Sequence, residues 1–341
     1  PSYAPGAYDD ASVDYDDTDH SYDSEGSPYY GLIVPRKQVR IRDGDTLIAL
    51  VQVEDWGMDF SLSGDMLAVA SLTDGLASLA QTTIDATAVS AELSGARVAA
   101  ILDAAGWPDG MRTLDAGKAT LAAGTADAGN ALTYLQKVES SDPGALFVGK
   151  DATLTFLDRA TLQTYDSGIA FGDDGIPFTE PYTVTYGTDD MVNRQTITYS
   201  GGTATSDNAS SQAMYGVIAQ PTIDTLIESG VDAALMADWI VERGGSPSLR
   251  IKVITVKRGA CSDAQWAQVL SLELGSTALV KWQPGGVGDV FSQYVKVDGI
   301  AHDISAGSTV WTVTLTLSET SAGFILDDPV FGVLDSGVLA F

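Results

Sequence analysis

The sequence predicts an α+β protein, mainly antiparallel β, in which two β-barrel or sandwich-like units flank a helix-containing middle domain. Three observations lead to this fold class. Residues 310–317 alternate apolar residues with threonines, as a half-buried antiparallel strand does. Near the start, two strand-forming segments flank Asp43-Gly44-Asp45, a turn sequence typical of a hairpin. Between residues 82 and 136 the spacing of apolar residues becomes helical.

Composition divides the 341 residues into five segments. Residues 1–27 form an acidic, Tyr- and Asp-rich arm or linker with almost no aliphatic residues. A first β unit covers 28–81, and a mixed α/β middle domain covers 82–180. A second β-barrel with inserted helices is expected over 181–320, followed by an apolar docking tail at 321–341.

The first β unit is expected to contain four strands and a helix that begins after Asp74, a plausible N-cap residue. The strands are 38–42, 46–53, 59–62 and 66–71, and the helix is 74–80. In the middle domain, apolar residues share one face after Ser94 and again after Asn130, so a helix is predicted after each. Asp142-Pro143-Gly144 ends the second helix before a strand pair. That pair spans 145–148 and 153–157.

The second β unit is expected to contain six strands interrupted by two helices. The strands are 182–186, 194–199, 249–256, 278–282, 294–297 and 311–317. The helices span 231–243 and 262–274. Gly244-Gly245 and Gly275 terminate them, because glycine readily adopts the conformation that follows a helix.

Charge and cysteine content exclude several classes of protein. The net charge is -28, from 46 acidic and 18 basic residues, and such a chain repels nucleic acid phosphates. The single Cys261 excludes an intramolecular disulfide. No apolar run approaches the roughly 20 residues of a membrane helix, and no signal-peptide pattern is present. The chain starts at Pro1 without an initiator Met, which leaves open that residues precede it.

Two motifs imitate sites without completing them. The run from Gly144 to Lys150 has the glycine-lysine spacing of a phosphate-binding loop, but Asp151 stands where a Ser or Thr should reach magnesium. Its intervening residues are strand formers, so a hairpin is predicted instead. In the acidic arm, six residues have calcium-loop spacing, but Asp19 occupies the position that needs Gly. They are Asp14, Asp16, Thr18, His20, Tyr22 and Glu25.

No catalytic, cofactor-binding or metal-ligating residue is assigned. The chain has only two histidines, and His302 lies in an alternating stretch, which favours a packed structural side chain over a catalytic one. Carboxylate pairs are too numerous to be informative. Tryptophans could line a sugar-binding groove, but Trp239 and Trp266 have helical core spacing with Leu235 and Leu270, which predicts their burial.

A series of short motifs occurs in order along the chain. They are Ser27-Pro28-Tyr29-Tyr30-Gly31, Val34-Pro35-Arg36, Asp55-Trp56, Ser61-Leu62-Ser63-Gly64-Asp65, Leu93-Ser94-Gly95-Ala96-Arg97, Gly106-Trp107-Pro108, Asn130-Ala131-Leu132-Thr133-Tyr134-Leu135, the stretch from Gly144 to Asp151, Leu272-Glu273-Leu274-Gly275, and Gly299-Ile300-Ala301-His302-Asp303-Ile304 before Trp311. This set resembles the minor tail or tail hub proteins of long-tailed, siphovirus-type phages of actinobacteria. The chain departs from that pattern in its acidic arm, where an earlier β segment is usual, and at Ala152, where Gly is more usual.

The resemblance implies a non-enzymatic subunit of the phage tail tip, assembled in the host cytoplasm and located in the virion at the distal end of the tail. Two tail-tube-type barrels per chain would build a trimeric ring between the tube and the fibres or spike. The expected partners are the chain itself, a distal tail protein, the tape measure protein, and fibres or spike. Genome DNA would only pass through the lumen, repelled by an acidic wall.

Three alternatives stay open at this point: a hexameric distal tail protein, a cell-wall hydrolase and a carbohydrate-binding module. The candidate functional residues are therefore assembly contacts. Aromatic and aliphatic side chains at a domain entrance and in the apolar tail are the expected interface residues. They are Tyr29, Tyr30, Phe324, Ile325, Phe331 and Phe341.

Overall fold

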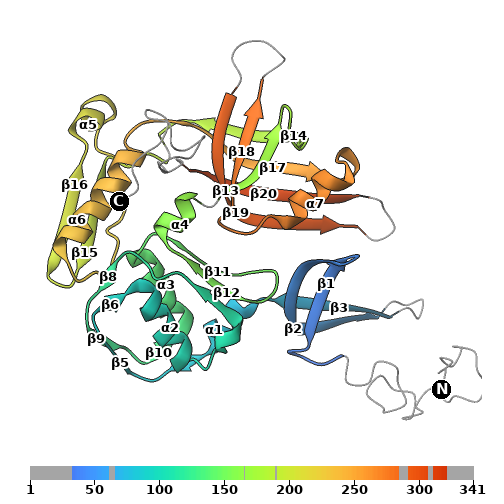
Figure 1. Ribbon diagram of the computed structural model, residues 1–341, viewed down its shortest axis with the longest axis horizontal. Coiled ribbons are helices and arrows are strands. Elements are labelled where there is room, and N and C mark those ends of the chain that lie inside the picture. Colours follow the sequence, from blue (N-terminus) through green and yellow to red (C-terminus); the bar gives the residue numbers. More distant parts are fainter. Residues whose placement is uncertain are drawn as a thin grey trace, which may run out of the picture. The chain divides into compact units, whose positions relative to one another are not determined.

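The protein is described by a computed structural model, in which residues 33–60, 66–164, 166–188, 190–283, 291–305 and 310–320 are defined. The chain divides into two compact units. The first contains residues 1–77 together with 150–152, and the second contains 78–149 and 153–341. Figure 1 colours both units by sequence and labels their elements. No helix in these described ranges is long and apolar enough to cross a membrane.

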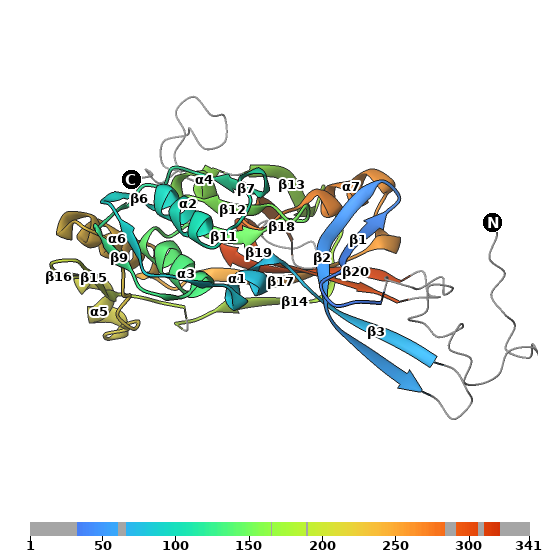
Figure 2. The ribbon, with the colours of Figure 1, turned by 90° about the horizontal axis from the view of Figure 1, so that it is seen from below.

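The first unit is built on an antiparallel sheet of β1 (Gln38–Asp43), β2 (Thr46–Phe60) and β3 (Met66–Thr73), in that order. Strands predicted at 46–53 and 59–62 are one strand, β2, which Figure 2 shows running from β1 to β3. β1 pairs with the first half of β2, up to Gln52, and β3 pairs with the second half, from Gln52 onward. The two halves of β2 therefore have different neighbours.

Asp74 begins α1 (Gly75–Gln81), as predicted, since its Oδ1 accepts a hydrogen bond from the Leu76 N–H at 3.0 Å. The first unit also contains the turn of residues 150–152, whose Lys150 carbonyl accepts from the Leu50 N–H at 2.7 Å. In this turn Ala152 has a φ of 64°, a left-handed conformation in which a Cβ is unfavourable. The sequence expectation that Ala152 stands in a glycine position agrees with this angle.

Replacing Ala152 with Gly is expected to stabilise the protein by about 0.5–1 kcal/mol. Removing the Cβ relieves about 1–2 kcal/mol of left-handed strain, and the greater freedom of Gly in the unfolded chain offsets roughly 0.5–1 kcal/mol of that gain. Urea unfolding of Ala152→Gly measures the difference. The matched control is Ala145→Gly in the strand just before the turn, which should destabilise because it adds freedom without relieving a positive φ.

The middle part of the second unit packs two helices side by side, α2 (Ser94–Ala104) and α3 (Ala131–Ser141). Both predicted helices are confirmed, and the Asn130 side chain accepts from the Thr133 N–H at 3.0 Å as the N-cap of α3. Short elements surround them: β4 (Thr83–Ile84), β5 (Thr87–Val89), β6 (Glu92–Leu93), η2 (Asp109–Met111), β7 (Arg112–Leu114), β8 (Thr120–Leu121), β9 (Gly124–Ala126), β10 (Gly129–Asn130), β11 (Ala145–Val148), β12 (Leu154–Leu157) and α4 (Arg159–Thr164). The core between α2 and α3 is apolar and fully buried, with Val98, Ile101, Leu102, Leu135 and Val138.

A six-stranded sheet forms the second β-rich part, in the order β13-β18-β19-β20-β17-β14. The strands are β13 (Asp166–Gly172), β14 (Thr179–Tyr186), β17 (Leu249–Lys257), β18 (Thr277–Trp282), β19 (Phe291–Ile304) and β20 (Trp311–Glu319). All neighbours are antiparallel except β13 and β18. In β20, Val313, Leu315 and Leu317 are buried and the threonines between them are not, which confirms the predicted alternation.

The predicted fold class is confirmed as α+β with mostly strands, whereas a closed barrel is not formed by the described strands. The ends of the six-stranded sheet are β13 and β14, which do not pair with each other in the defined ranges. One inserted helix, α7 (Asp263–Ser271), packs against this sheet, since Trp266 contacts Trp311 edge to face at a centroid distance of 5.1 Å. It is preceded by η3 (Arg258–Ala260) and ends earlier than predicted, because Leu272 already has an extended backbone.

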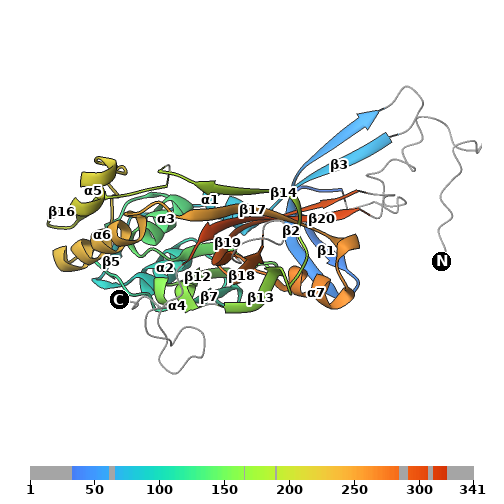
Figure 3. The same ribbon diagram turned by 90° about the horizontal axis from the view of Figure 1, so that it is seen from above.

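The other inserted helix, α6 (Gly230–Gly244), lies beside the hairpin of β15 (Arg194–Tyr199) and β16 (Gly202–Asp207). Figures 1 and 2 both show this pairing, with the short helix α5 (Ala209–Tyr215) after the hairpin, and Figure 3 shows α5, α6 and β16 from the opposite side to Figure 2. The α6 face that meets the hairpin carries small residues and one Met, so the helix approaches closely. The cluster consists of Ile197, Ile227, Ala233, Met236 and Ala237.

Candidate functional site: a charged cavity beside Trp239

The six predicted interface residues lie outside the described residues, so the structure does not test them. They are Tyr29, Tyr30, Phe324, Ile325, Phe331 and Phe341. The acidic stretch with calcium-loop spacing, residues 14–25, is outside as well. Within the part of the chain that is defined, no cluster of three or more His, Cys, Asp or Glu is arranged to hold a metal ion.

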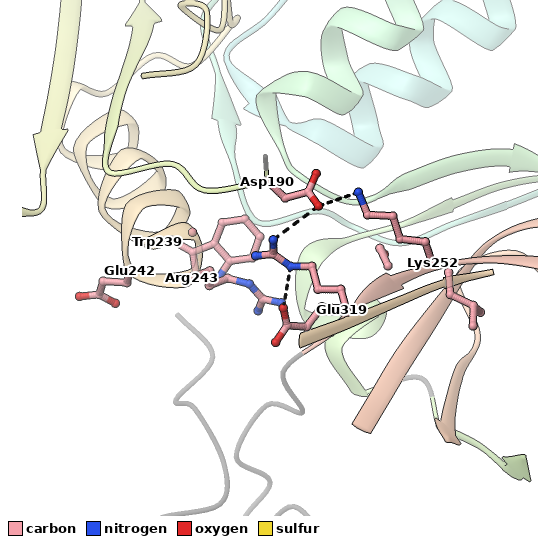
Figure 4. Close-up of a pocket in the computed structure, with 10 residues that line it drawn as sticks. Asp190, Trp239, Glu242, Arg243, Lys252 and Glu319 are labelled. Atoms are coloured by element: carbon pink, nitrogen blue, oxygen red, sulfur yellow. Dashed lines mark hydrogen bonds and ion pairs between the residues drawn. The ribbon is translucent and has the colours of Figure 1, made fainter. Parts of the chain in front are cut away.

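A cavity of about 760 Å³ lies within the second unit, where α6, β17 and β20 meet the segment just before β15. Such a volume is in the range of about 300–1,000 Å³ that is typical of ligand pockets. Figure 4 shows the side chains that line it. They are Asp190, Trp239, Glu242, Arg243, Gly244, Arg250, Lys252, Leu317, Ser318 and Glu319.

Ion pairs cross one side of this cavity. The Lys252 ammonium lies 2.8 Å from the Asp190 carboxylate, and the Arg250 guanidinium lies 3.5 Å from the same carboxylate. Arg250 Nε also donates to Glu319 at 3.1 Å, and the Ser248 hydroxyl donates to Glu319 at 2.6 Å. The hydrogen bond from Lys252 lowers the pKa of Asp190, so this carboxylate stays ionised at neutral pH. The cavity's Asp190 and Glu319 are thus already engaged by basic side chains.

Trp239 and Arg243 form another side of the cavity. The Arg243 guanidinium lies over the Trp239 ring, with its carbon 4.8 Å from the ring centroid. Figure 4 shows both side chains, one turn apart on α6, next to Glu319. Burial lowers the pKa of Arg243, and the negative charge of Glu319 acts against this shift. A cation that has lost part of its hydration in this way favours an anionic neighbour.

The predicted burial of Trp239 together with Leu235 is wrong. Leu235 is 43% exposed, and Trp239 is only partly buried where it lines the cavity. The physical reason is that α6 packs a different face against the hairpin. That face carries the small residues Ala233 and Ala237, and Trp239 lies outside the apolar cluster that they form. The same prediction is confirmed for Trp266 and Leu270 of α7, which are both buried against the sheet.

A smaller cavity of about 170 Å³ shares Trp239, Arg243 and Glu319 with the larger one. It adds two further cations, Arg159 and Lys296. Its other lining residues are Pro143, Gly144, Leu162 and Thr320. Both added cations have acidic partners, since Arg159 lies 3.9 Å from Asp142 and Lys296 lies 3.1 Å from Asp298.

Glu139 of α3 is a half-buried acid next to this region. Glu139→Gln is expected to flatten the dependence of protein stability on pH between acidic and neutral pH. Its carboxylate accepts from the Leu146 N–H at 2.9 Å, but burial raises its pKa above the ordinary 4.5, against smaller opposing effects of that bond and Lys296. Because the folded protein holds the proton more tightly, stability falls as pH rises through the raised pKa. The amide keeps the acceptor and removes this decline, which thermal unfolding at several pH values measures. A variant profile that falls as steeply as the wild type would contradict the assignment.

The remaining sequence motifs behave as structural elements. β11 and β12 pair as a hairpin over residues 145–157, which confirms the hairpin interpretation of the glycine-lysine run. His302 lies on β19, and its Nδ1 accepts from the Trp311 indole N–H at 3.2 Å. A packed structural histidine is thereby confirmed.

Sequence reasoning missed most residues of the cavity. Arg250 and Lys252 stand two apart on a strand, a spacing that places both on one face and signals a charged surface. Their partner Asp190 is about sixty residues away in a segment without a pattern, so the sequence held no sign of this ion pair.

Comparison with known proteins identifies the fold. No family model matches the sequence, and no curated protein matches it either. The structure is similar to the 43 kDa tail protein of prophage MuSo2 from Shewanella oneidensis, with 15% identity and a TM-score of 0.56 over 85% of each chain. It is also similar to a tail protein from Neisseria meningitidis MC58, with 12% identity and a TM-score of 0.56 over 83% of this chain and 84% of the other. The chain therefore has a fold found in phage tail proteins.

Proposed function

We propose that this chain is a structural subunit of a phage tail tip, a hub-type subunit that works by assembling into a ring and not by catalysis. The observation that carries the proposal is the fold likeness to two tail proteins, which extends over more than four fifths of each chain. The ordered motifs that resemble minor tail proteins of actinobacterial phages point to the same class.

Strand edges in the first unit support assembly with other subunits. β1 covers β2 only from Thr46 to Gln52, and β3 covers it only from Gln52 to Phe60. Each half of this 15-residue strand therefore has just one pairing strand among the described elements. Open edges recruit strands from another chain, and β3 also exposes Val69 and Leu72. Pairing between copies at these edges is how the barrel-like units would close.

The net charge suits a subunit that surrounds passing DNA. A wall with an excess of carboxylates repels phosphates, so the genome would leave the tail without binding to it. In this proposal the ring joins the tail tube, with its distal tail and tape measure proteins, to fibres or a spike.

Native mass spectrometry of the purified protein tests the assembly step. We expect a trimer; a hexamer would instead indicate the distal tail ring, and a monomer at every concentration would contradict ring formation. Val69→Lys combined with Leu72→Lys is expected to weaken the trimer, because both residues are exposed on β3. Met214→Lys combined with Val217→Lys is the control; it alters two apolar residues of the second unit that are even more exposed, and it should leave the trimer intact.

A further inference from the structure

We propose that the two outer strands of the first unit bind each other in neighbouring copies of the chain, head to tail, and that charge selects this contact. Arg40 and Arg42 on β1 of one copy would face Glu54 and Asp55, next to β3, of the following copy. The inference rests on the proposed function, because it names the two surfaces through which copies would join in the ring.

β1 presents a polar face and an apolar face. Its residues Gln38, Arg40 and Arg42 are exposed, whereas Val39 and Ile41 between them are half-buried. Successive side chains of a strand point to opposite faces of the sheet, so the two arginines lie on one face. That face is the polar one.

The polar face continues across β2 to β3. Gln52 is the partner of Gln38 on one side and of Thr73 on the other, so these three side chains lie on the same face. Ser71, two residues before Thr73 on β3, has the same orientation and pairs with Asp55 of β2. The polar face therefore carries arginines at the β1 edge and a carboxylate next to the β3 edge.

The β1 edge is basic. Arg40 and Arg42 are exposed and form no ion pair with a described residue. Arg36 and Lys37 precede the strand and add two cations. The acids nearby end the strand on its other face or lie in the turn beyond it, and they are Asp43 and Asp45.

The β3 edge is acidic. Glu54, the extra residue in the bulge of β2, and Asp55 are exposed, and neither has an ion-pair partner among the residues that the structure describes. This holds although Arg36 and Lys37 lie beside β2 just before them. β2 and β3 contain no Lys or Arg. The other charged residues in the described part of this unit add three acids and one cation, and they are Asp59, Asp74, Asp151 and Lys150.

Unlike edges favour a head-to-tail contact over a symmetric one. Two β1 edges would bring arginines of both copies together, and two β3 edges would bring carboxylates together, whereas β1 against β3 joins opposite charges. β1 and β3 lie on opposite sides of β2 (Figure 2), so both edges of one copy can be used at once. Head-to-tail contacts repeat from copy to copy and generate a ring when the rotation between copies closes.

The small size of Ser71 permits the charged groups to meet. Adjacent strands lie about 4.8 Å apart, so β1 of the next copy would lie about 10 Å from β2. Ser71 stands between them as the partner of Asp55, and a long arginine side chain extends over so small a residue. Hydrogen bonds between arginine and carboxylate are among the strong ones. Val69 and Leu72, which β3 exposes, would lose water in the same contact.

Charge reversal at the two edges tests the contact, with native mass spectrometry of a dilution series as the measurement. Arg40→Glu combined with Arg42→Glu is expected to raise the concentration needed for half-assembly about tenfold or more, because like charges then meet. Glu54→Arg combined with Asp55→Arg is expected to do the same. The quadruple variant keeps the wild-type net charge and is expected to assemble within about threefold of the wild type, since opposite charges face each other again.

The matched control is Asp85→Arg combined with Asp127→Arg, the same change of charge at two exposed acids of the second unit, and it should leave assembly intact. Full assembly of both double variants would overturn the head-to-tail contact and leave the ring-forming function standing. Weakened double variants without recovery in the quadruple variant would overturn it too, because the two edges would then not face each other. A wild type that stays monomeric would contradict the proposed function itself.

Discussion

Replacing Arg97 with Met is expected to destabilise the second unit by about 3–5 kcal/mol, the cost of breaking a buried charged network. Arg97 of α2 is 1% exposed, and all of its side-chain bonds are internal. It donates to Glu92 at 2.6 Å, to the Tyr134 hydroxyl at 3.0 Å, and to the carbonyls of Ser90 and Ala122 at 2.7 and 2.9 Å. Met fills much of the volume but leaves the Glu92 carboxylate and two carbonyls without their donor.

Arg194→Met is the matched control for this prediction. Arg194 makes an equally short ion pair with Asp207, at 2.6 Å, but both side chains are exposed. Exposed pairs contribute little, because water solvates the charges when the pair is lost. Chemical unfolding should therefore show a large fall in stability for Arg97→Met and none for Arg194→Met. A small effect at Arg97 would mean that the network is not a major stabiliser of the fold.

The second large effect is expected at Asp142, where replacement by Ala should cost about 3–5 kcal/mol through unsatisfied buried donors. Asp142 is fully buried at the C-terminal end of α3. One of its carboxylate oxygens accepts from the Ser94 hydroxyl at 2.6 Å, and from the N–H groups of Lys118 and Ala119 at 2.7 and 3.2 Å. The Ser94 bond ties the start of α2 to the end of α3, and the other two hold the segment before β8 at the same carboxylate.

Thermal unfolding of Asp142→Ala beside Asp109→Ala measures this contribution. Asp109 has an 85% exposed side chain in an ion pair with Arg112, so its removal should leave the melting temperature almost unchanged. Asp142→Asn is a second variant, expected to be intermediate because it keeps one acceptor oxygen but loses the charge. Equal melting temperatures for Asp142→Ala and Asp109→Ala would contradict the proposed role of the buried carboxylate.

Elements whose signals are local could be predicted from the sequence. The helix after Asn130 is marked by its N-cap and an apolar face, and the strand at 311–317 by strict alternation. By contrast, two-residue strands such as β4 and β6 pair with strands that are distant in the sequence. Two residues are too few to show the alternation of apolar and polar residues by which a strand is recognised. The sequence also predicts two strands where the structure has the single strand β2. The strand that pairs with β2 changes from β1 to β3 at Gln52, and no turn marks this change.

Long-range polar contacts are the main part that the sequence did not reveal. The motif that contains Ser94 and Arg97 is visible in the sequence, but its hydrogen-bond partners Asp142 and Tyr134 stand roughly forty to fifty residues further along. The same holds for the cavity, whose Asp190, Arg243 and Glu319 come from three separate elements. Trp239 was misplaced because helical spacing does not tell which of two apolar faces the hairpin will cover.

The central claim is that this chain is a ring-forming structural subunit of a tail tip. Electron cryo-microscopy of assembled phage particles tests it most directly. The account predicts three copies of the chain in a closed ring at the distal end of the tail, with strands of the first unit paired between copies. A particle whose tail tip contains no density for this fold would contradict it.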